Sequence, residues 1–95
     1  MDNRFYIVRA ERAGVFFGHI RERVGSEVTM TDVRQLWYWS GACSLSQMAV
    51  DGVKNPGKCK FTIAVPEITI LGVSEIIPAS EVAVKSIGDV KPWKR

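Results

Sequence analysis

The alternation of hydrophobic and polar positions predicts a chain built mainly from β-strands. Residues 5–8 are aromatic and β-branched, and residues 15–24 alternate between an apolar side and a side that becomes basic toward its end. Both patterns are typical of strands. The short polar turn between them predicts an antiparallel hairpin. Gly18 lies inside the second strand and indicates a bulge or a close approach by another backbone.

Two further strands are predicted at residues 27–30 and 33–39. Their apolar positions are even-numbered in the first strand and odd-numbered in the second. Because successive side chains of a strand point to opposite faces, this change of parity requires a turn or a bulge. We expect it at Thr31–Asp32.

Two short helices interrupt the strand pattern. Ser44 precedes Gln47 by three positions, which is the spacing of a capping box, and Gly52 is suited to end that helix. Ser80 is the expected N-cap of a second helix that ends at Gly88. A helix of about two turns is not stable alone, so the first helix must pack on the sheet.

The remaining strands are expected on either side of Pro66, which indicates an edge or a bend. Residues 59–65 alternate, whereas residues 67–77 are β-branched with both faces largely apolar, which predicts a central strand covered on both sides. The predicted fold class is therefore α+β and β-rich. We expect a curved antiparallel sheet or small barrel of about five to six strands with two short helices.

Composition narrows the class of protein. The chain has 95 residues, of which 46% are hydrophobic and 24% charged, which excludes disorder as the main state. We expect residues 1–90 to form a single globular domain and residues 91–95 to form a basic, aromatic tail. A core of this size is modest, so a homo-oligomer is a natural supplement. Without a signal peptide or a long apolar run, the expected location is the cytoplasm, with no membrane contact.

The sequence offers little for catalysis or metal binding. A Cys–His pair would need Cys43 or Cys59 together with His19, the only histidine. Both cysteines are expected to be free, buried thiols, because Cys59 has the parity of an apolar strand face and Cys43 adjoins a turn. No zinc-type spacing and no nucleotide-hydrolase or hydrolase motif is present. We therefore expect a protein that is not an enzyme and has no metal site and no cofactor.

An aromatic run favours a binding role. Tryptophan and tyrosine give large, rigid contact areas with a polar tip and are enriched at binding hot spots. On a strand, Trp37 and Trp39 share one face and Tyr38 the other. If the tryptophans fill the core, the tyrosine faces outward, and the reverse holds as well. Both arrangements stay open.

Small residues after this run lead into the N-terminus of the first helix, where free backbone N–H groups can hold an anion. A phosphate group there would have Ser44 as a cap contact and Arg34 or Arg21 nearby. In the alternative, Ser44 alone satisfies those donors. The predicted ligand-binding residues are Arg34, Trp37, Tyr38, Trp39, Ser40, Gly41, Ser44 and Gln47.

The run from Leu36 to Ala49 forms a long aromatic–Ser-Gly-Ala–helix motif. Further short motifs follow at Gly52-Val53, Cys59-Lys60-Phe61 and Val65-Pro66-Glu67, and others extend from Val8-Arg9 and Ala13-Gly14-Val15-Phe16 to Trp93-Lys94. In these motifs the chain resembles a small uncharacterised family found mostly in phage and prophage genomes. The resemblance implies a phage-type setting, with host-cell cytoplasm as the location, and supplies neither an activity nor functional residues.

Three functions follow as hypotheses. The first is an accessory, counter-defence binding protein that sequesters a phosphate-bearing, nucleotide-like ligand. The second is an inhibitor or structural subunit that binds a host defence protein or a phage protein through the Tyr38 face or an edge strand. The third is a nucleic-acid binder that uses residues 91–95 with Arg21 and Arg23. The net charge of +3, divided almost evenly between the two halves, argues against nucleic acid as the first choice. The tail would otherwise be solvated, or Trp93 would fold back on the domain.

Overall fold

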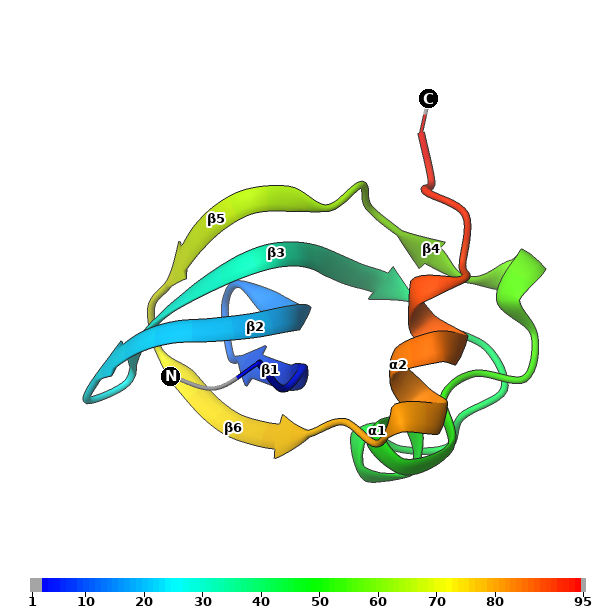
Figure 1. Ribbon diagram of the computed structural model, residues 1–95, viewed down its shortest axis with the longest axis horizontal. Coiled ribbons are helices and arrows are strands. Elements are labelled where there is room, and N and C mark those ends of the chain that lie inside the picture. Colours follow the sequence, from blue (N-terminus) through cyan, green and yellow to red (C-terminus); the bar gives the residue numbers. More distant parts are fainter. Residues whose placement is uncertain (1–2, 95) are drawn as a thin grey trace.

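Six antiparallel strands form one curved, open sheet, and two helices lie together at one end of it (Figure 1). The computed structural model describes residues 3–94; Met1, Asp2 and Arg95, which fall in the predicted domain and tail, lie outside the described residues. This architecture confirms the predicted fold class. The elements, in chain order, are β1 (Tyr6–Ala10), β2 (Gly14–Val24), β3 (Glu27–Tyr38), α1 (Leu45–Asp51), the 3-10 turn η1 (Pro56–Lys58), β4 (Lys60–Phe61), β5 (Val65–Ile70), β6 (Val73–Pro78) and α2 (Glu81–Gly88).

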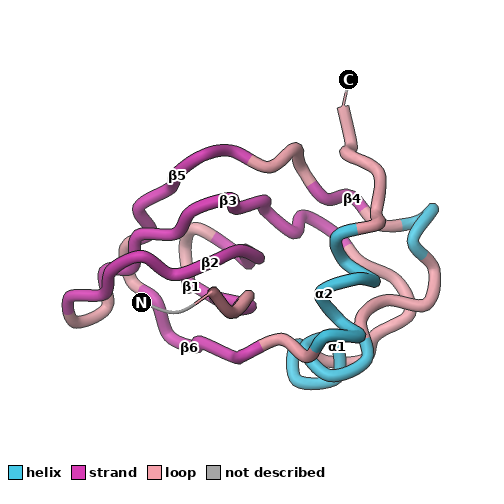
Figure 2. Tube along the Cα trace, in the orientation of Figure 1, coloured by secondary structure: helices cyan, strands magenta, loops and turns pink. Residues whose placement is uncertain are grey.

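The long strand β3 organises the sheet. The strand order is β4-β3-β2-β1-β6, and β5 pairs with the half of β3 that β4 leaves uncovered. The predicted hairpin of β1 and β2 is confirmed by pairs such as Ile7 with Phe17. In Figure 2 the turns that join β2 to β3 and β5 to β6 lie at the end of the sheet opposite the helices. The C-terminal segment passes beside β4 (Figure 1).

A bulge at Asp32 connects what the sequence pattern treated as two strands. His19 pairs with Thr31 but Phe17 pairs with Arg34, so β3 carries one extra residue opposite Gly18. Asp32 has a positive φ of 48°, which aspartate tolerates in a bulge. A Cβ at Gly18 would lie 2.9 Å from the Cα of Val33, so only glycine fits there. The expected bulge and close approach are confirmed, and β3 is one continuous strand.

The prediction for residues 59–77 was wrong in two respects. The strand expected over residues 59–65 is reduced to the two residues of β4, and β5 begins only at Val65. The run expected to be one central strand is split by a turn at Gly72, whose φ is +73°. Its two halves pair with different strands, β5 with β3 and β6 with β1. Both halves therefore lie at edges of the sheet, and Pro66 lies in the edge strand β5.

Two hydrophobic clusters lie on opposite faces of the sheet. Ile7 and Phe17 belong to the cluster that includes the helices, whereas their neighbours Val8 and Phe16 belong to the other. Neighbouring residues of a strand point to opposite faces, so the sheet separates the clusters. The helices contribute Met48, Ala49, Ala83 and Ile87, which confirms that the first helix packs on the sheet. Among residues 3–94 no helix is long and apolar enough to cross a membrane.

Candidate functional site

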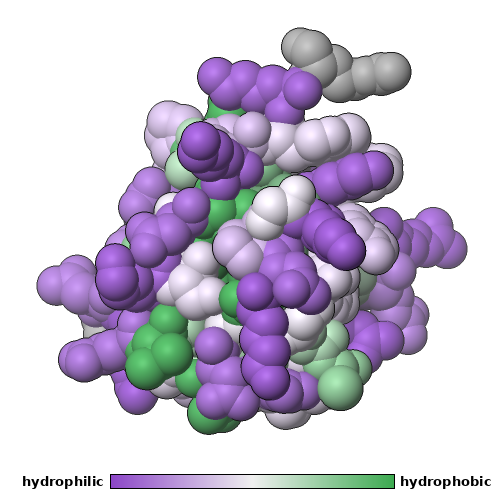
Figure 3. Space-filling view, turned by 90° about the vertical axis from the view of Figure 1, so that its right-hand side faces the viewer, coloured by the Kyte–Doolittle hydropathy of each residue, from purple (hydrophilic) through white to green (hydrophobic). Residues whose placement is uncertain are grey.

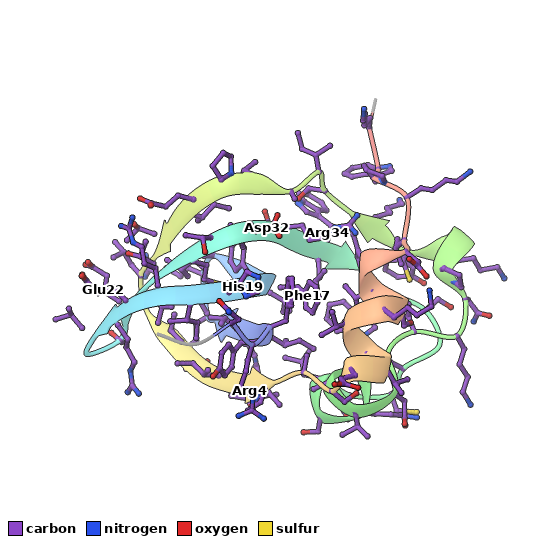
Figure 4. All side chains as sticks on the ribbon, viewed as in Figure 1. Arg4, Phe17, His19, Glu22, Asp32 and Arg34 are labelled. Atoms are coloured by element: carbon purple, nitrogen blue, oxygen red, sulfur yellow. The ribbon has the colours of Figure 1, made fainter. Side chains whose placement is uncertain are left out.

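Arg34 is held inside the molecule by three backbone carbonyl groups. Its Nε donates to the carbonyl of Thr62 at 2.9 Å, Nη1 to that of Ile87 at 3.0 Å and Nη2 to that of Phe61 at 3.3 Å. The guanidinium also lies 5.4 Å from the centre of the Phe61 ring. Figure 4 shows the side chain directed from β3 toward α2. Arg34 therefore joins the sheet to the C-terminal end of α2.

The burial of Arg34 has an electrostatic cost that the carbonyl groups offset. The residue is only 7% exposed, and desolvation lowers the pKa of its guanidinium. Carbonyl oxygens at a helix C-terminus carry partial negative charge and stabilise a cation there. None of these hydrogen-bond partners is one of the other predicted site residues. The arrangement makes Arg34 a structural link in the core.

The three aromatic residues at the end of β3 differ in their surroundings. Trp37 is 62% exposed and Tyr38 54% exposed, whereas Trp39 is half-buried against the helix cluster. The expectation that either both tryptophans or the tyrosine would face outward was wrong. That expectation required the strand to alternate regularly through Trp39. The strand β3 ends at Tyr38, however, and its last residues pair only with the two-residue strand β4.

The segment after the aromatic run is bonded to the loop that follows α1. The side-chain amide of Asn55 donates to the hydroxyl of Ser40 at 3.0 Å, and its backbone N–H donates to the Ser40 carbonyl at 3.4 Å. The N–H of Lys54 donates to the carbonyl of Gly41, also at 3.4 Å. Gly41 has a φ of +92°, and a Cβ there would lie 2.5 Å from the Lys54 nitrogen. Ser40 and Gly41 therefore serve this close contact between two loops.

The start of α1 uses its own side chains as acceptors. The hydroxyl of Ser44 accepts from the backbone N–H of Gln47 at 3.1 Å, which confirms Ser44 as the N-cap. The side-chain oxygen of Gln47 accepts from the N–H of Cys43 at 3.0 Å, one residue before the position that a capping box would reach. Ser44 and Gln47, both predicted as ligand-binding residues, are thus engaged within the protein.

The two cysteines and the histidine do not contact one another and instead contact other groups. Cys59 is buried with its Sγ 3.5 Å from the carbonyl of Asn55, and His19 has its Nδ1 2.9 Å from the carbonyl of Arg4. Cys43 is exposed, so the expectation of a buried thiol was wrong there, because it lies in the open turn before α1. Both thiols are free. Within the described range, no group of three or more metal-ligating side chains occurs.

The C-terminal segment brings a second tryptophan to Trp37. The N–H of Trp93 donates to the carbonyl of Phe61 at 2.8 Å, which fixes the segment beside β4. The rings of Trp37 and Trp93 lie 5.8 Å apart with their planes tilted by 41°. The ammonium group of Lys60 lies 5.5 Å from the centre of the Trp93 ring. We call these three residues, Trp37, Lys60 and Trp93, the indole platform.

A hollow of about 500 Å³ lies beside the indole platform. It separates the C-terminal segment from η1, so residues far apart in the chain form its two walls. Figure 3 faces this end of the molecule and shows hydrophilic side chains (purple) over much of the surface, with paler patches between them. The lining residues are Pro56, Gly57, Cys59, Asp89, Lys91, Pro92 and Trp93.

The family of the chain follows from a match to a family model over residues 3–87, described as a domain of unknown function, DUF6948. The chain belongs to this family. A search of curated proteins found no match to it, and a search of solved structures found none either. The DUF6948 match agrees with the resemblance to an uncharacterised family and includes Trp37 and Lys60, while Trp93 lies beyond its end.

Positive charge in this DUF6948 member is concentrated in the two segments that contribute the lining of the hollow. The two segments that form the hollow, residues 54–60 and 89–94, carry five lysines and one acidic residue, Asp89. The other residues of the described chain carry seven basic and eight acidic side chains. Asp89 is paired with Lys85 at 3.2 Å, and the five lysines form no ion pair with any residue in 3–94. They are Lys54, Lys58, Lys60, Lys91 and Lys94, and all are exposed.

A smaller hollow of about 330 Å³ opens near Arg34 and is of a different kind. Its charged lining residues are Arg34 and Asp32, which have opposite signs, and its other lining residues are mainly apolar. In Figure 4 Phe17 lies between the sheet and α2 on this side, and Glu22 lies at the far end of the sheet. The guanidinium is already bonded to three carbonyl groups, so this hollow offers a ligand fewer unpaired charged groups than the indole platform does.

Sequence reasoning identified Trp37 but missed its partners. The tail was recognised as basic and aromatic, and the option that Trp93 folds back is confirmed. Its contact with Trp37 joins the end of β3 to the end of the chain, and no local pattern indicates such a pairing. The concentration of lysines was missed as well. The net charge was compared only between the two halves of the sequence, whereas both segments that line the hollow lie within the second half.

Proposed function

We propose that this DUF6948 member is a non-enzymatic binding protein whose indole platform holds a nucleotide-type ligand. The observation that carries the proposal is the exposed pair of indole rings, Trp37 and Trp93, with the ammonium of Lys60 over one of them. An indole face stacks on a nucleobase, and lysine ammonium groups attract phosphate. The ligand combines an aromatic ring with at least one phosphate group.

The surroundings of the platform support this choice over the start of α1. Ser44 and Gln47 accept hydrogen bonds from the protein's own backbone, so their side chains are already engaged. The five lysines of residues 54–60 and 89–94, among them Lys60 of the platform and Lys91 of the hollow, have no acidic partner in the described residues. An anion that binds there restores charge balance without first breaking an ion pair.

A binding role without catalysis is supported by the residue types at the platform. The platform itself consists of two indoles and an ammonium group, which attract a ligand and include no carboxylate, imidazole, thiol or hydroxyl group. The hollow beside it adds one carboxylate, Asp89, which is paired with Lys85. The role would be stoichiometric capture of the ligand. We extend the proposal to a phage-type accessory and counter-defence role in the host cytoplasm, on the resemblance of the run from Leu36 to Ala49.

A second candidate is a protein partner or a second copy of the chain, and a separate surface favours it. Val50 on α1 is 61% exposed and Val82 on α2 is 65% exposed, and the two helices pack against each other. We propose these two valines as part of a contact surface, since a contiguous exposed apolar patch marks such a surface. Native mass spectrometry of the purified protein distinguishes these cases. A discrete dimer or a stoichiometric partner supports the second candidate, and a monomer that carries a nucleotide supports the first.

The proposal is tested by comparing the binding of a whole nucleotide with that of its nucleoside and of phosphate alone. Tryptophan fluorescence is followed during titration with adenosine monophosphate, with adenosine and with inorganic phosphate. We expect the nucleotide to bind more tightly than either fragment, because stacking and charge act together. Equal affinity for the nucleotide and for phosphate would show that the rings take no part. No fluorescence change and no retention of the nucleotide in equilibrium dialysis would contradict the proposal.

A further inference from the structure

The lysines near the indole platform come from three different segments of the chain, β4, η1 and the C-terminal segment. Lys60 lies over the Trp93 ring, Lys91 lines the hollow, and Lys58 ends η1 on the other side of it. One mononucleotide neutralises only the charges next to its own phosphate. A surface with several unpaired lysines in sequence around stacking rings matches a chain of phosphates.

We infer that the ligand of the indole platform is a segment of single-stranded nucleic acid, several nucleotides long. This inference rests on the proposed function and specifies its ligand. One base stacks against the exposed Trp37 and another against Trp93, while the backbone follows the hollow toward η1. The lysines along that path contact successive phosphates.

The openness of the surface supports a strand over a free nucleotide. Sites for small molecules bury most of the ligand. Here Trp37 is 62% exposed and Trp93 38% exposed, so a single bound nucleotide would keep much of its surface in water. Gly57 lines the hollow, and a side chain added there would meet no atom within 4 Å. A nucleic-acid backbone can therefore approach η1 closely.

Stacking also predicts which strands bind. In a duplex the base faces are covered by neighbouring bases, so the indoles gain no contact without unpairing. Asp89 is the only carboxylate that lines the hollow, and it is paired with Lys85. The hollow therefore offers no unpaired carboxylate to read a base edge. Binding should therefore favour single strands and depend little on sequence.

The test measures how affinity depends on strand length and on salt. Fluorescence anisotropy is recorded with labelled oligothymidylates of about 4, 8 and 16 nucleotides, which spans the usual site sizes for one small domain. Adenosine monophosphate and a duplex of the longest strand are competitors. We expect affinity to rise with length and then level off. If five lysines each neutralise one phosphate and so release its condensed counterion, log K should fall with log salt concentration with a slope of about −3.5.

Lysine variants give the matched control. Replacement of Lys60 and Lys91 by alanine should make the slope shallower by about 1.4, because each phosphate contact contributes about 0.7. Replacement of Arg12, on the turn between β1 and β2, and Arg23, near the end of β2, removes the same charge from exposed positions elsewhere and should leave the slope unchanged. A uniform change in both double variants would show a general effect of net charge and would overturn the path assigned to the strand.

The outcomes separate the inference from the proposed function. If the mononucleotide binds as tightly as the longest strand, with a slope near that of one contact, the platform binds nucleotides and the strand inference is overturned. Duplex binding as tight as that of the single strand would also overturn it, because stacking then plays no part. If neither the nucleotide nor any strand binds, the proposed function fails together with the inference.

Discussion

Two regions beside the end of β3, an inner end at Arg34 and an outer end at Trp37, use their polar and aromatic groups in opposite ways. At the inner end the guanidinium of Arg34 is buried and bonded to three carbonyl groups, and at the exposed start of α1 Ser44 and Gln47 likewise accept from backbone N–H groups. On the outer side, Trp37 is largely exposed and Lys60 has no acidic partner in the described residues. The first group holds the fold together, and the second group is left available for a ligand.

This contrast shows why residue type alone is a poor guide to a binding site. Arginine, serine and glutamine are common in anion sites, yet the same donors and acceptors are needed wherever buried backbone groups lack a partner. In residues 3–94 no buried side-chain nitrogen or oxygen is left without a partner. A polar side chain that satisfies a backbone group inside the protein is not free to bind a ligand, even where its residue type is common in anion sites.

The largest effect is expected at the inner end. Replacement of Arg34 by alanine removes three hydrogen bonds to a charged group and leaves the Thr62 carbonyl without this donor, while the Phe61 and Ile87 carbonyls keep the N–H groups of Trp93 and Val90. The free energy of unfolding should therefore fall by about 3–5 kcal/mol. Urea unfolding followed by circular dichroism measures this change. The matched control is Arg9→Ala, which breaks an exposed ion pair with Glu75 and should cost less than about 1 kcal/mol. Equal losses in the two variants would contradict a structural role for Arg34.

The pH dependence of the Arg34 link has a definite sign. Desolvation lowers the pKa of this group in the folded state, so the unfolded chain binds its proton more tightly. The contribution of Arg34 to stability therefore rises with pH only in the strongly alkaline range where the group titrates. We expect the stability difference between wild type and Arg34→Ala to stay constant across neutral pH. A difference that changes between mildly acidic and mildly alkaline buffer would contradict this assignment.

A second large effect is expected where the loops meet. Gly41→Ala places a Cβ 2.5 Å from the nitrogen of Lys54 at a φ of +92°, so we expect a loss of about 2–3 kcal/mol in unfolding free energy. Gly25 is the matched control, because it also has a positive φ, +60°, but no atom lies within 4 Å of its added Cβ. Gly25→Ala should cost about 1 kcal/mol. Similar thermal stabilities for the two variants would show that the contact with Lys54 can relax.

At the outer end the expected effect is on affinity. Trp37→Ala should weaken binding of a short oligothymidylate by about 5- to 100-fold, the usual range for loss of one stacked base. The free energy of unfolding should change by less than about 1 kcal/mol, because the side chain is 62% exposed. Tyr38→Ala removes a ring of similar exposure from the other face of β3 and should leave affinity unchanged. The reverse ranking of the two variants would move the site to the Tyr38 face.

The smallest effect is expected at the helix cap. Ser44→Ala should lower the free energy of unfolding by about 1 kcal/mol, as should Ser80→Ala at the start of α2. Neither change should alter ligand affinity, since neither hydroxyl belongs to the indole platform. A selective loss of nucleotide affinity in Ser44→Ala alone would return the site to the start of α1.

Much of the fold could be predicted because its signals are local. Alternation identified β1 and β2, a change of parity located the bulge at Asp32, and spacing identified both N-caps, Ser44 and Ser80. The split of β5 from β6 was missed. A β-branched run has the same local preference whether it forms one strand or two, and the turn at Gly72 is decided by pairing with β3 and β1.

The site was harder to predict, because its contacts are not local. The partners of Arg34 are backbone carbonyl groups, which every residue carries, so no sequence pattern reveals them. The partner of Trp37 is Trp93, near the other end of the chain. Only the three-dimensional path of the C-terminal segment beside β4 brings these indoles and the lysines together.

The most direct test is a titration of the 15N-labelled protein with a short oligothymidylate, followed by NMR. We predict that the indole N–H signals of Trp37 and Trp93 and the backbone amides of η1 and the C-terminal segment shift on binding. The indole of Trp39 and the amides at the start of α1 should remain in place, because their side chains are engaged within the protein. Shifts centred on Ser44–Gln47, with unchanged indole signals at Trp37 and Trp93, would contradict the assignment of the site to the indole platform.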